Sequence, residues 1–160
     1  MPRLPVLHEC DVLIVGGGPA GVAAAIELAA AGHAVELVEQ GAAPGGAIHR
    51  QPASASSGCR AVLPQWRRLA KAMAATGFPV HMRCVFLGMD SDGLCLVEDR
   101  RTGIVSAIRT AAVVVAVGAV ERVLPRPGTE LPGVTTAGGM QVMLKETGRA
   151  PRGRILIAGN

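Results

Sequence analysis

The sequence predicts an α/β fold in which a parallel sheet carries helices on both faces and a small antiparallel β-meander is added. Three observations predict it: an apolar run that becomes a glycine cluster and then a helical stretch at 11–31, a second apolar strand at 34–39, and a β-branched run at 111–117. A helical segment between two apolar strands is typical of parallel pairing. Apolar residues make up 49% of the 160 residues, enough for one domain, or slightly more, with a sizeable core.

The first unit consists of a strand, a turn and a helix, after a loose lead-in at 1–9. Residues 12–15 form a short apolar strand, and residues 19–31 form a helix whose apolar positions recur on one face. Pro19 costs little in the first turn, because its nitrogen would have no helical partner there. Gly32 is a natural C-terminal stop. The strand at 34–39 then completes a β-α-β unit.

The turn of this unit carries the spacing G-x-G-x-x-G at Gly16, Gly18 and Gly21. The first glycine permits a tight turn, the second lets backbone approach a pyrophosphate, and the third lets the helix pack closely on the sheet. Glu39 ends the second strand about 20 residues later, where a carboxylate that binds the ribose is expected. The pattern predicts a Rossmann-like dinucleotide-binding unit; the alternative is that the glycines are only turns and that Glu39 is a solvated strand end.

The remaining segments alternate between loops, helices and strands. A Gly/Ala/Ser/Pro-rich loop at 41–60 has the length of a functional loop over a cofactor. Trp66 shares one helical face with Leu69 and Met73 in the next helix, while the basic side chains point outward. The predicted elements after the loop are a helix at 64–76, meander strands at 80–88, 93–98 and 104–109, a strand buried on both faces at 111–117, a helix at 135–146 and a strand that begins at 154.

Composition excludes several classes of function. The net charge of +4 comes from scattered basic residues, and aromatic residues make up only 2% of the chain, so base-stacking platforms for nucleic acid are not expected. No apolar run reaches the roughly 18 to 20 residues of a membrane span, and a cytoplasmic location follows by default. The four cysteines, Cys10, Cys59, Cys84 and Cys95, form no C-x-x-C pair, so neither a metal site nor dithiol chemistry is predicted.

The order of motifs resembles the FAD-dependent flavoproteins called pyridine nucleotide-disulfide oxidoreductases. The resemblance rests on the segment 11–21, on Pro44-Gly45-Gly46 and on Ala116-Val117-Gly118. It implies that the glycine motif and Glu39 hold the ADP half of FAD, and that the Gly45-Gly46 loop approaches the flavin. Val117 stands where the family usually has Thr, which removes a hydroxyl at that position.

A narrower resemblance covers nearly the whole chain. The segments 45–52, 117–125 and 131–141 are similar to motifs of the FAD-containing α-type subunits of opine oxidase, D-hydroxyproline dehydrogenase and hydrogen cyanide synthase. This implies oxidation of a C–N bond in an amino or imino acid, in a hetero-oligomer with a second flavoprotein subunit and a small iron–sulfur subunit. Ala47 and His49 depart from the usual Gln and Tyr.

The resemblance also implies a domain plan. Residues 1–150 are expected to form the N-terminal portion of an FAD-binding domain, with 79–109 as the meander, and 151–160 the first strand of an incomplete second dinucleotide-binding domain. Family members continue through an NAD(P)-like domain, so NAD(P) is expected only in a complete chain. The 160 residues alone are expected to be inactive.

The expected site is therefore dominated by cofactor contacts. His49 and Arg50 are the catalytic candidates, as a proton relay and as a partner for a carboxylate or phosphate, respectively. Glu121 and Arg122 match the family pattern or form a surface ion pair. The predicted cofactor-binding residues are Gly16, Gly18, Pro19, Ala20, Gly21, Glu39, Gln40, Gly45, Gly46, Arg50, Ala116 and Gly118.

Two alternatives stay open at this point. One is a non-catalytic or remnant dinucleotide-binding fragment, and the other is an NAD-dependent oxidoreductase that uses the same glycine motif. Glu39 argues against NADP, because a carboxylate repels a 2′-phosphate. The choice of FAD over NAD depends on the later motifs alone.

Overall fold

The computed structural model describes residues 6–50 and 64–158, and the chain divides into two compact units. The first unit comprises residues 1–50 and 62–119, and the second comprises residues 51–61 and 120–160. Part of the predicted loop at 41–60, including Cys59, lies outside the described residues. None of the described helices is both long and apolar enough to cross a membrane.

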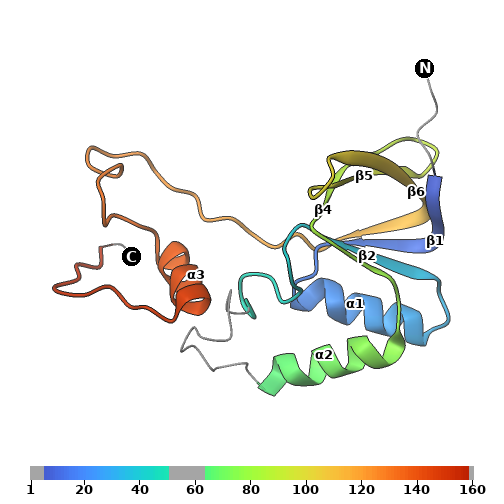
Figure 1. Cartoon of the computed structure of the whole chain (residues 1–160), viewed down its shortest axis with the longest axis horizontal. Helices are drawn as coiled ribbons and strands as arrows, with labels where there is room; N and C mark the ends of the chain where they lie inside the picture. The colour runs from blue at the N-terminus through green and yellow to red at the C-terminus, as the bar shows by residue number, and fades with distance from the viewer. Residues whose placement is uncertain (1–5, 51–63, 159–160) are drawn as a thin grey trace. The chain divides into compact units, whose positions relative to one another are not determined.

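The first unit is built on one sheet of six strands, in the order β3-β2-β1-β6-β5-β4 (Figure 1). The four neighbouring strands β3, β2, β1 and β6 run parallel to one another. β5 and β4 continue the sheet beyond β6 in antiparallel pairing. The bounds are β1 (Val6–Val15), β2 (Val35–Glu39), β3 (Val80–Met82), β4 (Cys84–Met89), β5 (Leu94–Asp99) and β6 (Ile104–Val115).

Two helices cover one face of this sheet. α1 (Pro19–Ala30) and α2 (Pro64–Thr76) contribute Val22 and Trp66 to a buried cluster with Ile14 and Leu37 of the sheet. The predicted face of α2 is confirmed, since Leu69 and Met73 pack against the same cluster. The predicted bounds of both helices agree with the structure to within one residue.

The opposite face is covered by strands and not by a helix. Leu13 and Val38 are buried there against Cys95, Val97 and Ile108, which come from the antiparallel strands and the long strand β6. The fold class is confirmed, but the prediction of helices on both faces holds for only one face in the described residues. The reason is that the meander folds back over the sheet and supplies the apolar layer that a second helix layer would have provided.

β6 joins two elements that the sequence predicts as separate strands. The predicted strands at 104–109 and 111–117 form one strand that pairs with β5 in its first half and with β1 along most of its length. The burial predicted for 111–117 is wrong, because Val115 and Val117 are 68% and 66% exposed. Their side chains are apolar, but no described element of the first unit packs over that end of the strand.

The predicted strand at 80–88 is divided into two. β3 extends the parallel edge beside β2, whereas β4 pairs with β5, and Arg83 lies between them with a positive φ of 59°. The N–H of Arg83 donates to the carbonyl of Gly41 at 2.9 Å, and its own carbonyl accepts from Arg100 at 2.9 Å. These bonds fix a turn that a run of apolar residues does not reveal.

β1 begins earlier than predicted. The sequence predicts a loose lead-in over 1–9, but Val6 and His8 pair with Ala107 and Ile108 of β6. The long neighbour strand therefore extends β1 beyond its apolar centre.

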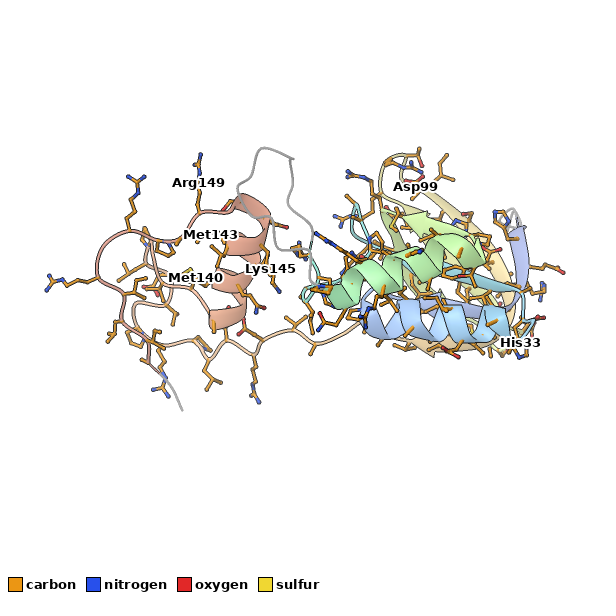
Figure 2. The ribbon with its side chains drawn as sticks, turned by 90° about the horizontal axis from the view of Figure 1, so that it is seen from below. His33, Asp99, Met140, Met143, Lys145 and Arg149 are labelled. Carbon is orange, nitrogen blue, oxygen red and sulfur yellow. The ribbon has the colours of Figure 1, made fainter. Side chains whose placement is uncertain are left out.

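The second unit contains one described helix, α3 (Ala137–Thr147), whose labelled side chains Met140 and Met143 appear in Figure 2. Thr136 is the N-cap and accepts from the N–H of Gly139 at 3.0 Å, while Gly148 ends the helix in the left-handed conformation. The helix agrees with the predicted segment at 135–146 to within two residues. Residues 154–158, expected to begin a strand, form none here, because a strand needs a partner for its backbone groups.

Candidate cofactor site

The parallel strands bring the predicted residues to one edge of the sheet. β1, β2 and β6 end at Val15, Glu39 and Val115, and β1 lies between the other two. The chain leaves β1 toward β2 on one side and returns as β6 on the other. Ligands of open α/β sheets bind at such a switch point, beyond the carboxyl ends of the strands.

Two glycines of the motif are needed for backbone packing. Gly16 has a φ of +107°, and its N–H donates to the carbonyl of Val38 at 2.8 Å. A Cβ at Gly16 would collide with the carbonyl of Ala116, and a Cβ at Gly21 would collide with the carbonyl of Gly16. These glycines let three neighbouring backbone segments meet at the turn.

Gly18 has a different role. Its φ of −69° is accessible to any residue, and a Cβ built there meets no heavy atom within 4 Å. The space beside Gly18 is therefore open, as the approach of a pyrophosphate requires.

The loop at 44–46 lies directly on the glycine motif. The N–H of Gly45 donates to the carbonyl of Gly17 at 2.7 Å, and a Cβ at Gly46 would lie 3.1 Å from the Cα of Gly18. Gly45 and Gly46 both have positive φ values, +122° and +60°. The structure thus brings this predicted loop to the predicted cofactor edge.

The N-terminus of α1 points at the same place. The helix has Pro19 in its first turn, no side-chain cap at Gly18 and no acidic residue in the first turn. Its first helical bond joins the N–H of Val22 to the carbonyl of Gly18 at 3.0 Å. The N–H groups of Ala20 and Gly21 thus precede the first intrahelical bond, and together with the helix dipole they suit an anion.

Glu39 is held by two backbone donors at the end of β2. Its Oε2 accepts from the N–H of Gly17 at 2.6 Å, and its Oε1 accepts from the N–H of Gly41 at 2.5 Å. The residue is buried, at 9% exposure. Each carboxylate oxygen has a second lone pair, so both can still accept a bond from a ribose hydroxyl.

Gly17 and Gly41 hold the Glu39 carboxylate, and neither is among the residues that the sequence predicts for the site. A Cβ at Gly17 would lie 2.9 Å from Oε2 of Glu39, and a Cβ at Gly41 would lie 2.8 Å from Oε1. Both glycines therefore make room for the carboxylate that their N–H groups bind. The signal in the sequence was the presence of glycine at two positions that the G-x-G-x-x-G spacing does not require.

The remaining predicted residues are placed less directly. The His49 ring stacks on Trp66 of α2, with centroids 5.4 Å apart and planes at 21°, and the residue is half-buried. Arg50 and Gln40 are exposed. Gly118 follows β6 with a φ of +75° and open space at its Cβ position.

Glu121 belongs to the second unit and binds the start of α3. Its Oε1 accepts from the N–H of Gly138 at 2.9 Å. Hydrogen bonds from the Thr136 hydroxyl and from backbone N–H groups lower the pKa of the Glu121 carboxyl. The structure thus uses Glu121 to cap a helix, where the sequence left open a surface ion pair with Arg122.

The described cysteines are free thiols. Cys84 and Cys95 are buried and Cys10 is half-buried. Burial raises the pKa of the Cys95 and Cys84 thiols, which keeps them in the less nucleophilic protonated form.

Comparison with known proteins agrees with this geometry. The family model described as "Pyridine nucleotide-disulphide oxidoreductase" matches residues 10–159. An opine oxidase subunit of Agrobacterium tumefaciens (strain Ach5) is 35% identical over 159 residues, which cover 93% of this chain and 32% of the relative. The hydrogen cyanide synthase subunit HcnB of Pseudomonas aeruginosa is 31% identical over 154 residues, with 92% and 33% covered.

Among solved structures, L-proline dehydrogenase from P. horikoshii superposes with a TM-score of 0.68 at 21% identity. The match covers 91% of this chain and 30% of that one, and at this identity it supports the fold. The chain spans about a third of the length of the curated relatives named above.

The chain belongs to the pyridine nucleotide-disulphide oxidoreductase family, whose members are FAD-binding oxidoreductases with a Rossmann-like fold. The resemblance drawn from the motifs is confirmed, and so is FAD as the cofactor of the family. The two relatives are named as subunits, which agrees with the expectation that such chains belong to multi-subunit enzymes.

Proposed function

We propose that this chain is the FAD-binding portion of an oxidoreductase that oxidises a C–N bond of an amino acid, imino acid or opine-like substrate. The observation that carries the proposal is the arrangement at the carboxyl ends of β1 and β2. There, an open position at Gly18, the N-terminus of α1 and the fixed carboxylate of Glu39 lie together. This arrangement fits the diphosphate and ribose of a dinucleotide.

Different residues are proposed to bind different parts of the cofactor. Ala20 and Gly21 direct N–H groups at the diphosphate, and Gly18 leaves room for its approach. Glu39 accepts hydrogen bonds from the ribose hydroxyls, with both oxygens already oriented by Gly17 and Gly41. Gly46 lies against Gly18 and would border the cofactor beside it. The flavin supplies the two-electron acceptor when bound, and the protein supplies position and electrostatics.

The substrate class is supported by the relatives. The opine oxidase subunit and the hydrogen cyanide synthase subunit HcnB match more than nine-tenths of this chain, and a proline dehydrogenase shares its fold. The names of the two relatives refer to nitrogen-containing substrates or products. Both relatives are named as subunits. From the motif resemblance we expect two partners, namely a second flavoprotein subunit and a small iron–sulfur subunit.

His49 is proposed to position the loop rather than to carry protons. Its ring stacks on Trp66, and this contact anchors residues 45–49 to α2. Arg50 is exposed at the end of this loop and remains a candidate for binding an anionic group of substrate or cofactor.

The experiment that tests the proposal is a titration of the purified protein with FAD and, separately, with NAD. FAD binding is followed by quenching of flavin fluorescence and by a shifted visible spectrum, and NAD binding by calorimetry. Stoichiometric FAD binding without NAD binding supports the proposal. NAD binding without FAD binding would favour the NAD-dependent alternative.

Turnover is tested separately with opine, sarcosine, hydroxyproline and proline, using an artificial electron acceptor. We expect FAD binding but no turnover from the 160 residues alone, because a cofactor held at its ADP end lacks the positioning that contributes strongly to catalysed rates. We expect turnover of one of these amines when the partner subunits are added, or when a chain as long as those of the relatives is assayed in place of the 160 residues. Robust turnover by the 160-residue monomer would refute the expected inactivity.

A further inference from the structure

Three neighbouring strands place two imidazoles and a carboxylate together, on residues that the cofactor site does not use. His8 is on β1, Glu36 on β2 and His81 on β3, and these strands are adjacent in the sheet. Nε2 of His81 lies 2.6 Å from Oε2 of Glu36, and Nδ1 of His8 lies 3.7 Å from Oε1. The two imidazole rings are 5.4 Å apart between centroids.

The three side chains differ in how deeply they are buried. The Glu36 side chain is 6% exposed, His81 is 23% exposed and His8 is 47% exposed. A buried carboxylate is costly unless it is paired or coordinates a metal ion. The ring of His8 is therefore the group of the three that solvent reaches most easily.

This cluster is separate from the cofactor site. Glu36 precedes Glu39 by three positions on β2, which corresponds to roughly 10 Å along a strand. Alternation along the strand puts Glu36 on the face of Val38, which packs against the antiparallel strands, and Glu39 on the other face. A ligand can therefore occupy this cluster whether or not the cofactor site is occupied.

We propose that His8, Glu36 and His81 bind a divalent transition-metal ion of the zinc type. Two imidazole nitrogens and one carboxylate oxygen are a ligand set that suits zinc and leaves a fourth position for water or another ligand. One ligand atom from each residue lies within 4.8 Å of the other two. Ligands at about 2.0–2.1 Å in tetrahedral geometry lie roughly 3.3–3.4 Å apart.

The required adjustment is small and falls on the residue that is most able to move. His8 is half-exposed near the start of β1, so its ring can turn toward the carboxylate without disturbing the core. His81 must separate from Glu36 by less than about 1 Å to admit an ion between them, judged against the same ligand spacing.

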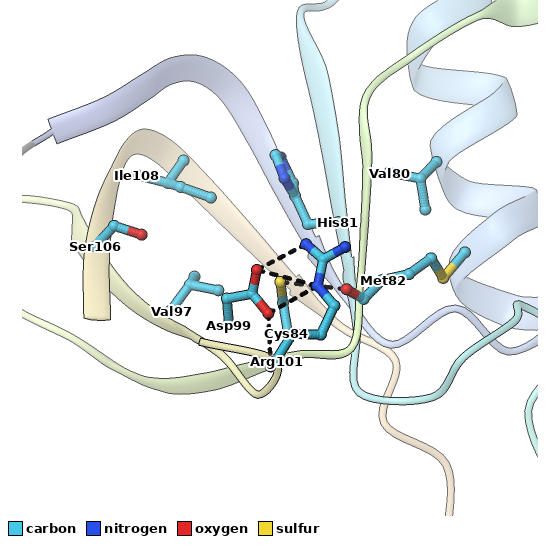
Figure 3. A pocket seen from close by; sticks show the side chains of 9 residues that line it. All are labelled: Val80, His81, Met82, Cys84, Val97, Asp99, Arg101, Ser106 and Ile108. Carbon is cyan, nitrogen blue, oxygen red and sulfur yellow. Dashed lines mark hydrogen bonds and ion pairs between the residues drawn. The ribbon is translucent and has the colours of Figure 1, made fainter. Parts of the chain in front are cut away.

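His81 also lines a cavity beside the antiparallel strands β4 and β5. The cavity has a volume of about 290 Å³, and the Asp99–Arg101 ion pair lines it on the side of the β5–β6 turn (Figure 3). An ion or a small ligand of that ion could therefore approach His81 from this cavity as well as from the side of His8.

The test is a titration of the purified chain, stripped with a chelator, with Zn²⁺ followed by calorimetry. We expect one ion bound per chain. His8→Gln is expected to lower the affinity at least about 10–100-fold, because even changes to groups that only support metal ligands have effects of that size. Glu36→Gln is expected to lower it at least as much.

His33→Gln is the matched control. Nδ1 of His33 lies 4.0 Å from Oδ2 of Asp11 on the surface, so His33 also pairs with a carboxylate. Among the described residues, this pair has no second imidazole beside it that would complete a set of three metal ligands. This variant is expected to bind Zn²⁺ as the parent does. If Co²⁺ is used instead, its visible absorption should indicate tetrahedral coordination in the parent and be lost in His8→Gln.

The exposed position of His8 keeps the test decisive even if Glu36→Gln fails to fold. Absence of stoichiometric Zn²⁺ binding by the parent would overturn the proposal. So would parental Zn²⁺ affinity in a folded His8→Gln variant, or an equal loss in His33→Gln. FAD affinity, measured in the presence and absence of chelator, is expected to be unchanged.

Discussion

The N–H of Gly17 donates a 2.6 Å hydrogen bond to Oε2 of Glu39, and this bond joins the turn after β1 to the end of β2. The carboxylate is therefore oriented before any ligand arrives. A group fixed in advance loses less conformational freedom on binding, which favours affinity. The same bond makes Glu39 part of the turn as well as part of the proposed ribose site.

Glu39→Ala is expected to weaken FAD binding by about ten- to a hundredfold. The lost hydrogen bonds to a charged acceptor contribute roughly 1.5–3 kcal/mol. Fluorescence titration with FAD measures the effect. Glu27→Ala, which removes an exposed carboxylate from α1, is the control and is expected to keep the parental affinity. Equal affinities for Glu39→Ala and the parent would contradict the assigned role.

Gly18→Ala and Gly21→Ala are expected to separate cofactor binding from folding. A Cβ at Gly18 meets nothing in the protein, so this variant should unfold at the parental temperature but bind FAD more weakly. A Cβ at Gly21 collides with the carbonyl of Gly16, so that variant should be destabilised. Thermal unfolding without FAD and titration with FAD measure the two effects. The reverse ranking of melting temperatures would refute the assignment.

Asp99 is expected to contribute to the acid stability of the first unit. Hydrogen bonds from Arg101 lower the pKa of its carboxyl from 3.8 to about 2. A carboxyl with a lowered pKa stabilises the folded state above its unfolded pKa, and this contribution is lost as the pH falls through the folded value. The Tm difference between the parent and Asp99→Asn should therefore be constant above about pH 5 and shrink as the pH falls from about 5 to about 2. A difference independent of pH across this range would contradict the prediction.

Leu37→Ala is expected to destabilise the first unit by about 2–5 kcal/mol, because it leaves a cavity in a core that is closed on all sides. Leu37 is fully buried between β2 and the two helices. Denaturant unfolding gives the free energy. The control is Ile104→Ala, whose side chain is 61% exposed and whose effect should stay within about 0.5 kcal/mol. Similar losses for the two variants would argue against the helix-covered core.

The sequence predicted the elements whose signals are local. The bounds of the helix after Gly18 and of the helix that begins at Pro64 follow closely from the sequence, because the N-terminal prolines, the glycine stops and the apolar periodicity are local signals. The glycine motif and Glu39 could be predicted to come together for the same reason, since a β-α-β unit brings the two strand ends side by side.

Features that depend on distant pairing could not be predicted in the same way. The turn at Arg83 is set by hydrogen bonds to Gly41 and Arg100, which are remote in sequence. The exposure of Val115 follows from the absence of a covering layer in the described part of the first unit, whereas β-branched composition alone suggested burial. The proximity of His8 to His81 likewise depends on which strand lies beside β2.

The placement of β6 has a consequence for the order in which the chain can fold during synthesis. β1 is made first and pairs with β2 soon afterwards, but its other edge has to wait for residues 104–115. Until then the ribosome-bound chain carries an open edge of hydrogen-bonding groups, of the kind that recruits other strands. Closing the sheet requires a contact between residues about a hundred positions apart, and such contacts form slowly. Between the emergence of β1 and that of β6, this edge is therefore open to pairing with other strands, and chaperones protect chains in such states.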